Sequence, residues 1–332
     1  MKQLMVTFSP SDTDRRSIEE ALRHLAEVRF LVDASPEDRM AALKRAEILL
    51  TWHLSRELKS EEIRALAGLQ FMELLSAGAD HLPFDLIPDQ VRIASNVGGY
   101  AEPMAEHVMA FLLALAKDLQ GGHRKLASGV FDQTTANRRI AGMTAGILGY
   151  GGIGRASARL MKAFGMRVEA VNRSGRGDEY ADWIGSPDHL DALLPRVDVL
   201  LITLPLTAET RGLIGARELK LMKPDAILIN VARGDIIVER DLYEHLRSHP
   251  QFLAGIDAWW TEPFRNGAFS TNYPFFDLDN LMGTPHNSGI VPGTMEEALR
   301  MAVDNVRRFL SGESVRGMVN RREYLSLPLK GE

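Results

Sequence analysis

The stretch Gly149-Tyr150-Gly151-Gly152-Ile153-Gly154 decides the fold of this chain. An apolar segment at 145–148 precedes it, a segment with helical spacing at 155–164 follows, and a second apolar segment lies at 166–171. This order predicts a strand, a glycine turn, a helix and a second strand within about 30 residues, the βαβ unit that binds a pyrophosphate at a helix N-terminus. Gly149 permits the tight turn, Gly151 lets backbone approach the phosphates, and Gly154 lets the helix pack on the strand. We therefore predict a dinucleotide site at this turn.

Further apolar runs extend this unit into a complete sheet. They recur at 198–204, 226–231, 252–257 and 280–284. Continuous apolar runs are typical of parallel strands that are buried on both faces. With the two strands beside the glycine turn, they predict a doubly wound domain of six parallel strands.

The first hundred residues predict a second domain of the same class. Candidate strands lie at 3–8, 27–31, 48–51, 71–75 and 92–94, and helical spacing lies between them, for example at 16–25 and 36–46. A long helix is predicted at 101–126, and its apolar residues lie on more than one face, which is typical of a helix buried between domains or subunits. The last helix, 294–310, follows the second sheet, so we expect the C-terminus to pack back on the first domain.

The predicted fold is therefore α/β, with two doubly wound parallel-sheet (Rossmann-like) domains. A dinucleotide-binding domain, 99–286, is inserted into a discontinuous substrate domain formed by 1–98 and 287–332. A chain of 332 residues has room for about two such domains.

Composition excludes several classes of protein. A net charge of −5 without a run of Lys and Arg argues against nucleic-acid binding. The absence of cysteine removes disulfides, thiol nucleophiles and thiolate metal sites, and we expect no metal. The longest apolar run, 108–116, is about half a membrane span, and the N-terminus does not resemble a signal peptide. We expect a cytoplasmic enzyme without a membrane partner, although composition alone leaves a non-enzymatic module open.

Polar residues follow three of the predicted strands in the second half of the chain. Arg233 follows 226–231, Glu262 follows 252–257, and His286 follows 280–284. Open α/β sheets bind ligands at the carboxyl ends of their strands, so these three side chains are expected to meet beside the cofactor.

With these motifs, the chain resembles the D-isomer-specific 2-hydroxyacid dehydrogenases over nearly its whole length. The motifs that carry the resemblance are the glycine turn, Pro205-Leu206-Thr207 with Thr210, Leu221-Met222-Lys223-Pro224, Asn230-Val231-Ala232-Arg233-Gly234, Asp257 with Glu262-Pro263, Thr284-Pro285-His286, Ser76-Ala77-Gly78-Ala79-Asp80 and Ala105-Glu106-His107. The resemblance implies a homodimer that is joined largely through the long helix at 101–126.

The resemblance also implies roles for the site residues. His286 would donate a proton to the substrate carbonyl, and Glu262 would orient the imidazole and favour its charged form. Arg233 would polarise the carbonyl and hold the substrate carboxylate, with help from the backbone N–H groups of Gly78 and Ala79. His53, His81, His107 and His123 have no such support and are interpreted as structural.

Two of the assigned residues keep an alternative interpretation. Asp257 would bond the nicotinamide carboxamide, and a cap at the end of its strand is the alternative. Trp52 would lie beside the C3 substituent of the substrate and favour small acids, and packing beneath the loop is the alternative. The residues assigned to the cofactor are Tyr150, Gly151, Gly152, Ile153, Gly154, Asn172, Arg173, Ser174, Pro205, Thr210, Val231, Ala232, Asp257 and Ser288.

The residues after the second strand of the βαβ unit bear on cofactor choice. Many relatives carry an acid here that binds the adenosine ribose hydroxyls, whereas this chain reads Asn172-Arg173-Ser174-Gly175-Arg176. Arg173, Ser174 and Arg176 suit a 2′-phosphate, so NADP(H) is favoured. A solvated basic turn that accepts either cofactor, NAD(H) included, is the alternative.

The sequence therefore predicts hydride transfer between NADP(H) and a small D-specific 2-keto or 2-hydroxy acid, most closely resembling a glyoxylate/hydroxypyruvate reductase. An NAD-dependent phosphoglycerate or formate-type dehydrogenase is one alternative. Asn287-Ser288-Gly289 resembles the formate enzymes, but those enzymes pair their histidine with Gln rather than Glu. A dinucleotide-sensing binding protein on the same fold is the other alternative.

Overall fold

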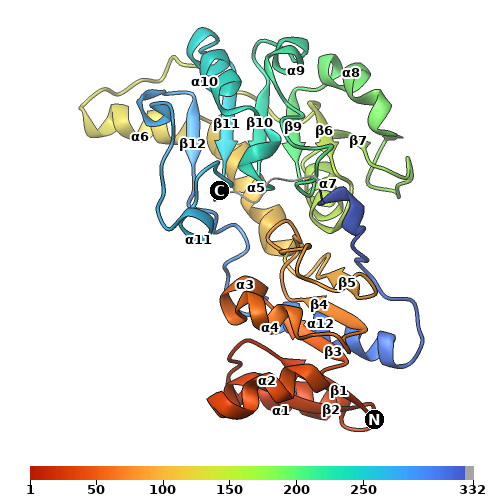
Figure 1. Cartoon of the computed structure of the whole chain (residues 1–332). Coiled ribbons are helices and arrows are strands. Elements are labelled where there is room, and N and C mark those ends of the chain that lie inside the picture. Colours follow the sequence, from red (N-terminus) through yellow and green to blue (C-terminus); the bar gives the residue numbers. More distant parts are fainter. Residues whose placement is uncertain (326–332) are drawn as a thin grey trace. The chain divides into compact units, whose positions relative to one another are not determined.

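The computed structural model describes residues 1–325, and the chain divides into two compact units (Figure 1). One unit, the first domain, holds residues 1–100 and the chain from 292 onward, and the other, the cofactor domain, holds 101–291. The boundaries expected after residues 98 and 286 lie a few residues earlier than these. Residues 326–332, which the sequence assigned to the first domain, lie outside the described residues.

The first domain is built on a parallel five-stranded sheet in the order β2-β1-β3-β4-β5. Its strands are β1 (Lys2–Val6), β2 (Ala26–Phe30), β3 (Ile48–Thr51), β4 (Phe71–Leu74) and β5 (Arg92–Ser95). Its helices are α1 (Asp12–Leu22), α2 (Pro36–Arg45), α3 (Leu54–Glu57), α4 (Ser60–Arg64) and α12 (Thr294–Leu310). This strand order is one of the two common doubly wound arrangements, as the sequence predicted.

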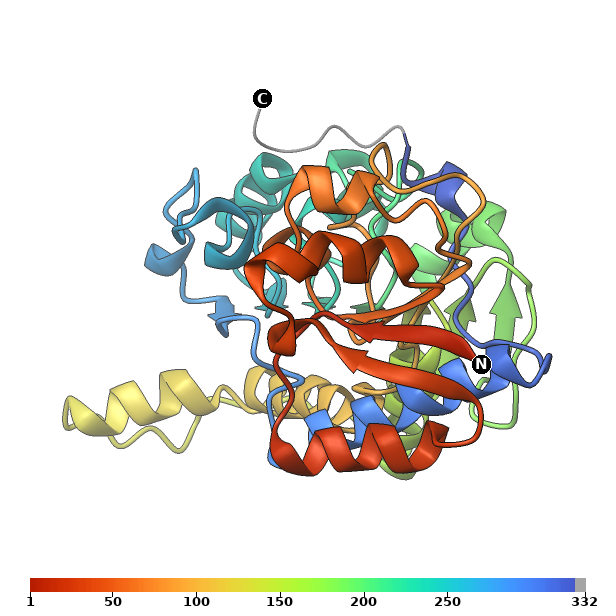
Figure 2. The same ribbon diagram turned by 60° about the horizontal axis from the view of Figure 1, so that its bottom comes forward.

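Alternate side chains of these strands point into two separate cores. Leu4 and Val6 face α1 and α12, whereas Met5 faces the core that includes Leu43 of α2. Figure 2 shows α12, in blue, beside α1 on one face of the sheet and α2 on the other. The last helix thus completes a core that the first hundred residues begin.

Glu73 of β4 is a carboxyl group inside this core. Its side chain is fully buried, Oε2 accepts a 2.7 Å hydrogen bond from Nδ2 of Asn305, and Oε1 has no hydrogen-bond partner among residues 1–325. Burial raises the pKa of Glu73 well above its ordinary value, and the hydrogen bond from Asn305 offsets only part of that rise. Glu73 therefore stabilises the fold least when it is ionised.

We expect Glu73→Gln to stabilise the protein at neutral and alkaline pH. Because the folded-state pKa lies above the unfolded value, the contribution of Glu73 is fully present below the unfolded pKa and is lost as pH rises through the folded pKa. Glutamine mimics the protonated form and should add about 1–3 kcal/mol to the free energy of unfolding above that window. Thermal unfolding across a pH series measures this, with exposed Glu19→Gln as the control. An unchanged pH dependence of the melting temperature would contradict the assignment.

The cofactor domain contains a parallel seven-stranded sheet in the order β12-β11-β10-β9-β6-β7-β8. Its strands are β6 (Thr144–Leu148), β7 (Arg167–Val171), β8 (Trp183–Gly185), β9 (Val199–Ile202), β10 (Ile227–Asn230), β11 (Leu253–Ile256) and β12 (Leu281–Gly283). Its helices are α5 (Ala101–Ala116), α6 (Leu119–Ala127), α7 (Gly152–Ala163), α8 (Leu190–Leu193), α9 (Ala216–Leu221), α10 (Glu239–Ser248) and α11 (Pro263–Asn266).

Six of the seven strands were predicted. The predicted total of six strands was therefore wrong, because the sheet has one more. The additional strand, β8, has three residues and pairs with β7 at the edge of the sheet. A three-residue strand gives too short a pattern for periodicity to distinguish from a loop.

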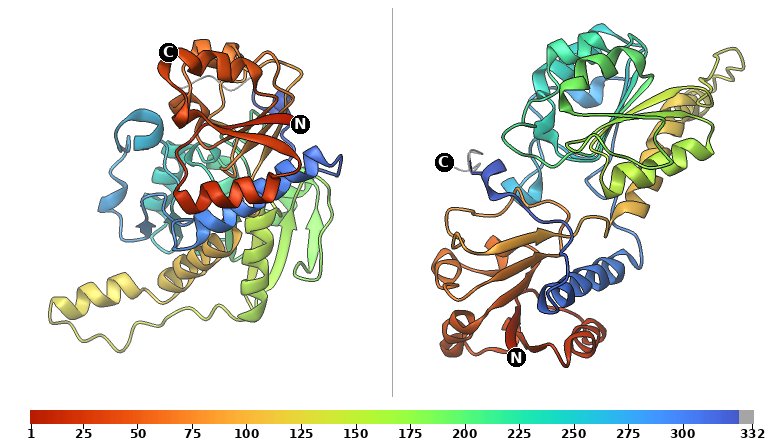
Figure 3. Two further views of the ribbon diagram at one scale, coloured as in Figure 1. Left: turned by 90° about the horizontal axis from the view of Figure 1, so that it is seen from below. Right: turned by 90° about the vertical axis from the view of Figure 1, so that its right-hand side faces the viewer.

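The prediction of one continuous helix at 101–126 was also wrong. The chain breaks between α5 and α6 at Asp118, which has φ 45° and ψ 45°, and the Asp118 carboxylate caps α6 by accepting from the N–H of Gly121 at 3.2 Å. Asp adopts this left-handed conformation more readily than most residues, and it is a favoured N-cap. The segment 117–138, drawn in yellow, extends away from the rest of the cofactor domain in both views of Figure 3.

Two features are absent from the described part of the chain. None of the helices within residues 1–325 is long and apolar enough to cross a membrane. In that same range, no group of three or more His, Cys, Asp or Glu side chains is placed to hold a metal ion.

Candidate active site

Three neighbouring strands of the cofactor domain deliver the candidate catalytic residues to one edge of the sheet. β10, β11 and β12 are hydrogen-bonded side by side and parallel, and Arg233, Glu262 and His286 follow their carboxyl ends. The loops after β10 and β11 press together, because a Cβ atom at Gly234 would collide with the backbone of Trp259 and Trp260. Close packing of these loops therefore requires glycine directly after Arg233.

Glu262 and His286 form a hydrogen-bonded pair. Oε1 of Glu262 lies 2.8 Å from Nδ1 of His286 and also accepts the backbone N–H of Trp259 at 2.7 Å. The Glu262 side chain is 5% exposed, whereas that of His286 is 25% exposed. An ionised carboxylate only accepts, so Nδ1 carries a proton and Nε2 is the nitrogen that can exchange one with a ligand.

Asn230 braces the loop that carries Arg233. This fully buried amide accepts the N–H of Ala232 at 3.0 Å and donates to the carbonyl oxygen of Arg233 at 2.9 Å. Nη1 of Arg233 also donates to the carbonyl oxygen of Ala232 at 2.7 Å. The sequence contained Asn230 within a recognised motif but offered no role for it, because its partners are backbone groups that only the folded loop brings together.

Asp257 is buried at the end of β11 and binds the turn that follows His286. Its oxygens accept the hydroxyl of Thr284 at 2.6 Å, the N–H of Asn287 at 3.1 Å and the N–H of Ser288 at 3.2 Å. Burial acts to raise the pKa of Asp257, but hydrogen bonds from Ser288 and Thr284 and the nearby His286 outweigh it and leave the pKa below its ordinary value. The hydrogen bonds that Asp257 accepts therefore favour its charged form, although the side chain is buried.

The glycine turn has the geometry that its sequence predicts. Gly149 has φ 99°, and a Cβ atom at Gly154 would collide with the carbonyl oxygen of Gly149. A Cβ at Gly151, in contrast, would meet nothing within 4 Å, so packing within the chain does not require glycine there. The space in front of Gly151 and the uncapped N-terminus of α7 fit a bound pyrophosphate.

Tyr150 closes one side of this turn. Its hydroxyl donates to Oδ1 of Asp178 at 2.6 Å, and Arg155 forms an ion pair with the same carboxylate. Burial and then the neighbouring Asp178 raise the pKa of Tyr150. The Tyr150 side chain therefore remains a neutral hydrogen-bond donor.

The turn after β7 is organised by its own polar side chains. Nδ2 of Asn172 donates to the carbonyl oxygen of Arg176 at 2.7 Å, and the hydroxyl of Ser174 donates to Oδ1 of Asn172 at 3.2 Å. Arg173 is exposed on this turn.

The loop after β9 is also held by one of its own side chains. The hydroxyl of Thr210 donates to the carbonyl oxygen of Pro205 at 2.7 Å. Asn172, Ser174 and Thr210 thus shape two loops that were assigned to the cofactor.

The first domain carries the remaining predicted site residues, Trp52, Gly78 and Ala79, after β3 and β4. The carboxylate of Glu57 fixes the first of these loops, because it accepts the N–H groups of Trp52 at 3.2 Å and His53 at 2.7 Å. Trp52 is half-buried and stacks on His53 with 5.3 Å between ring centroids. Burial and then the nearby Arg56 lower the pKa of His53 below its ordinary value, which disfavours the charged form of this imidazole.

Comparison with known proteins gives the family. The model of the D-isomer specific 2-hydroxyacid dehydrogenase NAD binding domain matches residues 109–288, more than half of the chain. The chain belongs to this family. The predicted resemblance and fold class are confirmed, and the chain is an NAD(P)-dependent D-2-hydroxyacid dehydrogenase.

Individual members of the family match over most of the chain. The D-3-phosphoglycerate dehydrogenase of Methanocaldococcus jannaschii is 26% identical over 320 residues, which cover 95% of this chain but only 60% of that protein. The glyoxylate reductase of Thermococcus gammatolerans is 29% identical over 327 residues, which cover 88% and 95% of the two chains. The structure of NADPH-dependent glyoxylate/hydroxypyruvate reductase from Sinorhizobium meliloti, in complex with NADP and sulfate, has a TM-score of 0.78, 26% identity and coverage of 98% and 100%.

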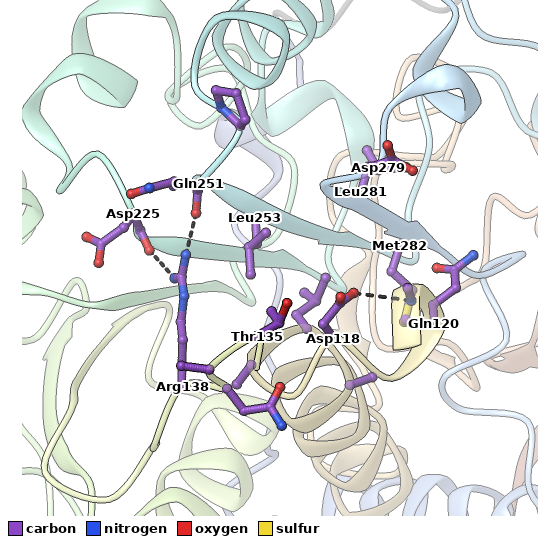
Figure 4. A pocket seen from close by; sticks show the side chains of 17 residues that line it. Asp118, Gln120, Thr135, Arg138, Asp225, Gln251, Leu253, Asp279, Leu281 and Met282 are labelled. Carbon is purple, nitrogen blue, oxygen red and sulfur yellow. Dashed lines mark hydrogen bonds between the residues drawn. The ribbon is translucent and has the colours of Figure 1, made fainter. Parts of the chain in front are cut away.

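A separate hollow in the cofactor domain of this dehydrogenase lies away from the catalytic residues. It has a volume of about 510 Å³ and is lined by the segment 114–138 and by residues at the amino ends of β10, β11 and β12 (Figure 4). Arg138 crosses it and donates to the carbonyl oxygens of Asp225 and Gln251. Because the catalytic candidates follow the carboxyl ends of the same strands, this hollow is at the opposite edge of the sheet.

Proposed function

We propose that the protein reduces small 2-keto acids such as glyoxylate and hydroxypyruvate to D-2-hydroxy acids, with NADPH as the preferred cofactor. The hydrogen-bonded pair of Glu262 and His286 carries this proposal, because it supplies an oriented acid at the sheet edge where open α/β sheets bind ligands. A glyoxylate reductase among the relatives supports the same class of substrate.

Each residue of the candidate active site has a separate role in the proposed reduction. A hydride for the carbonyl carbon of the substrate would come from the reduced cofactor when it is bound. Nε2 of His286 gives a proton to the carbonyl oxygen, while Glu262 holds Nδ1 and stabilises the positive charge of the imidazole. Arg233 binds the substrate carboxylate and polarises the carbonyl, and the backbone N–H groups of Gly78 and Ala79 contribute to carboxylate binding. Trp52 limits the size of the substituent at C3.

The residues that would hold the cofactor follow the carboxyl ends of strands in the cofactor domain. The N-terminus of α7 and the turn from Tyr150 to Gly154 would bind the pyrophosphate. The loops around Pro205 and Thr210, Val231 and Ala232, and Asp257 and Ser288 would provide the remaining contacts.

Turnover of the purified chain with a panel of acids tests the proposal. Glyoxylate, hydroxypyruvate, pyruvate and 3-phosphohydroxypyruvate are each offered with NADPH and with NADH, and formate oxidation is measured with NAD⁺. The proposal expects the highest kcat/KM for glyoxylate or hydroxypyruvate with NADPH. A preference for the phosphorylated acid or for formate would indicate that the protein is a phosphoglycerate or formate-type dehydrogenase. Cofactor binding without turnover would indicate a dinucleotide-sensing role.

The basic turn after β7 gives a separate prediction for cofactor choice. If Arg173 makes a charge-assisted bond to the 2′-phosphate, Arg173→Ala should cost about 1.5–3 kcal/mol, or about 10- to 150-fold in kcat/KM for NADPH, with little change for NADH. Arg167→Ala is the matched control, because Arg167 is exposed at the opposite end of β7. Equal losses with both cofactors would show that Arg173 does not recognise the 2′-phosphate.

We also propose a homodimer. The segment from α6 onward exposes a series of large apolar side chains at Leu119, Leu126, Val130 and Phe131. Exposed apolar groups on an extended segment fit a surface that a second copy of the chain covers. Sedimentation of the full chain measures the assembly, and a monomer at micromolar concentration would refute it.

A further inference from the structure

A chain of side-chain hydrogen bonds connects α5 to the carboxylate of Asp257. The hydroxyl of Thr284, just after β12, donates to Oδ1 of Asp257 at 2.6 Å and lies 3.0 Å from Nε2 of His107. A hydroxyl has one proton, so Thr284 must accept from His107, and Nε2 of His107 is the protonated nitrogen. The His107 ring is held edge-on against Phe111, with 4.8 Å between centroids. The direction of each bond in this relay is therefore fixed.

The relay ends at the turn that contains His286. His286 has φ 53°, a left-handed conformation that is uncommon for any residue other than glycine. The two N–H groups that follow it, those of Asn287 and Ser288, both donate to Asp257. A carboxylate that accepts two consecutive N–H groups keeps the turn in this conformation, and the same conformation directs the imidazole to Glu262 at 2.8 Å.

We propose that His107 and Thr284 are positioning residues for the reaction: through Asp257 they hold the backbone of His286 in the conformation that places its imidazole on Glu262. This inference rests on the proposed role of His286 as the acid. It gives His107, interpreted from the sequence as structural, a part in catalysis, and it gives Asp257 a function that does not depend on contact with the nicotinamide.

Thr284→Val tests the relay, because valine keeps the shape of threonine and removes the hydroxyl. The expected result is a loss of about 10- to 100-fold in kcat, the effect of a misplaced catalytic group, with nearly unchanged NADPH affinity. A larger primary isotope effect with NADPH deuterated at the transferred position should accompany the loss. Thr284→Ser should restore kcat. Thr271→Val is the matched control, because the Thr271 hydroxyl donates only to the carbonyl oxygen of Tyr273 at 2.9 Å.

A double substitution tests whether the two residues act in series. His107→Phe removes the donor to Thr284, and His107→Phe with Thr284→Val should lower kcat no further than Thr284→Val alone. Additive losses would show that the two residues act independently and would overturn the relay.

Histidine NMR separates a failure of the relay from a failure of the proposed function. The imidazole signals of His286, assigned with His286→Ala, should shift in Thr284→Val and remain in place in Thr271→Val. If wild-type protein reduces no keto acid and the shift is still seen, the relay holds and the proposed function fails. If the wild type is active and Thr284→Val matches Thr271→Val in both kcat and spectrum, the relay is wrong.

Discussion

Replacement of His286 by alanine should lower kcat/KM for keto acid reduction by about 10²–10⁴-fold, the usual contribution of a positioned general acid. The loss arises because the carbonyl oxygen must gain a proton as the hydride reaches the carbon, and water is a poorer donor than an imidazolium. Steady-state kinetics with NADPH and glyoxylate measure the loss.

Dinucleotide binding provides the internal control for this variant. The glycine turn and Arg173 follow β6 and β7, whereas His286 follows β12 at the far end of the sheet order. NADPH affinity from fluorescence titration should therefore be retained. A variant with nearly full activity would refute the assignment of His286 as the acid.

Replacement of Glu262 by glutamine should lower kcat/KM for keto acid reduction by about tenfold or more. The Glu262 carboxylate lies 2.8 Å from Nδ1 of His286 and orients the imidazole. Glutamine keeps the length of the side chain but replaces this charge-assisted hydrogen bond with a neutral one. Steady-state kinetics with NADPH and glyoxylate measure the loss.

Binding of NADPH by the same variant is the control for a general loss of structure. The affinity from fluorescence titration should be retained, because the glycine turn follows β6 whereas Glu262 follows β11. If kcat/KM is unchanged in Glu262→Gln while an isotope effect shows that hydride transfer limits the rate, Glu262 does not position His286 for proton transfer.

The parts of this structure that could be predicted from sequence are those that depend on local patterns. The glycine turn needs a positive φ at Gly149 and close contact at Gly154, and glycine is the residue that permits both. The catalytic candidates follow buried apolar runs, and parallel strands carry the residues at their carboxyl ends to one edge. These two local rules were sufficient to predict the pair of Glu262 and His286, which lie 2.8 Å apart, and to put Arg233 after the neighbouring strand β10.

The parts that could not be predicted depend on contacts between distant segments. The bond from His107 to Thr284 joins residues 177 positions apart, and no spacing within α5 indicates that its second turn meets the end of β12. Asn230 and Asp257 act on backbone groups whose direction exists only in the folded turns. The break at Asp118 lacks the glycine or proline that would have signalled it, because an acidic side chain provides both the left-handed residue and the cap.

The insertion of the cofactor domain into the first domain has a consequence for synthesis on the ribosome. Ala298 and Asn305 of α12 complete the core around β4 and bind Asn96 and Glu73, which leave the ribosome far earlier. At about 5–20 residues per second, synthesis of the chain between β5 and the end of α12 takes about 10–40 s, and during this time the sheet lacks its last helix. During that interval the apolar face that α12 will cover is open to chaperones and to other nascent chains, while the inserted domain emerges as one uninterrupted segment. The nascent N-terminal sheet is therefore the part of this enzyme most exposed to misassembly.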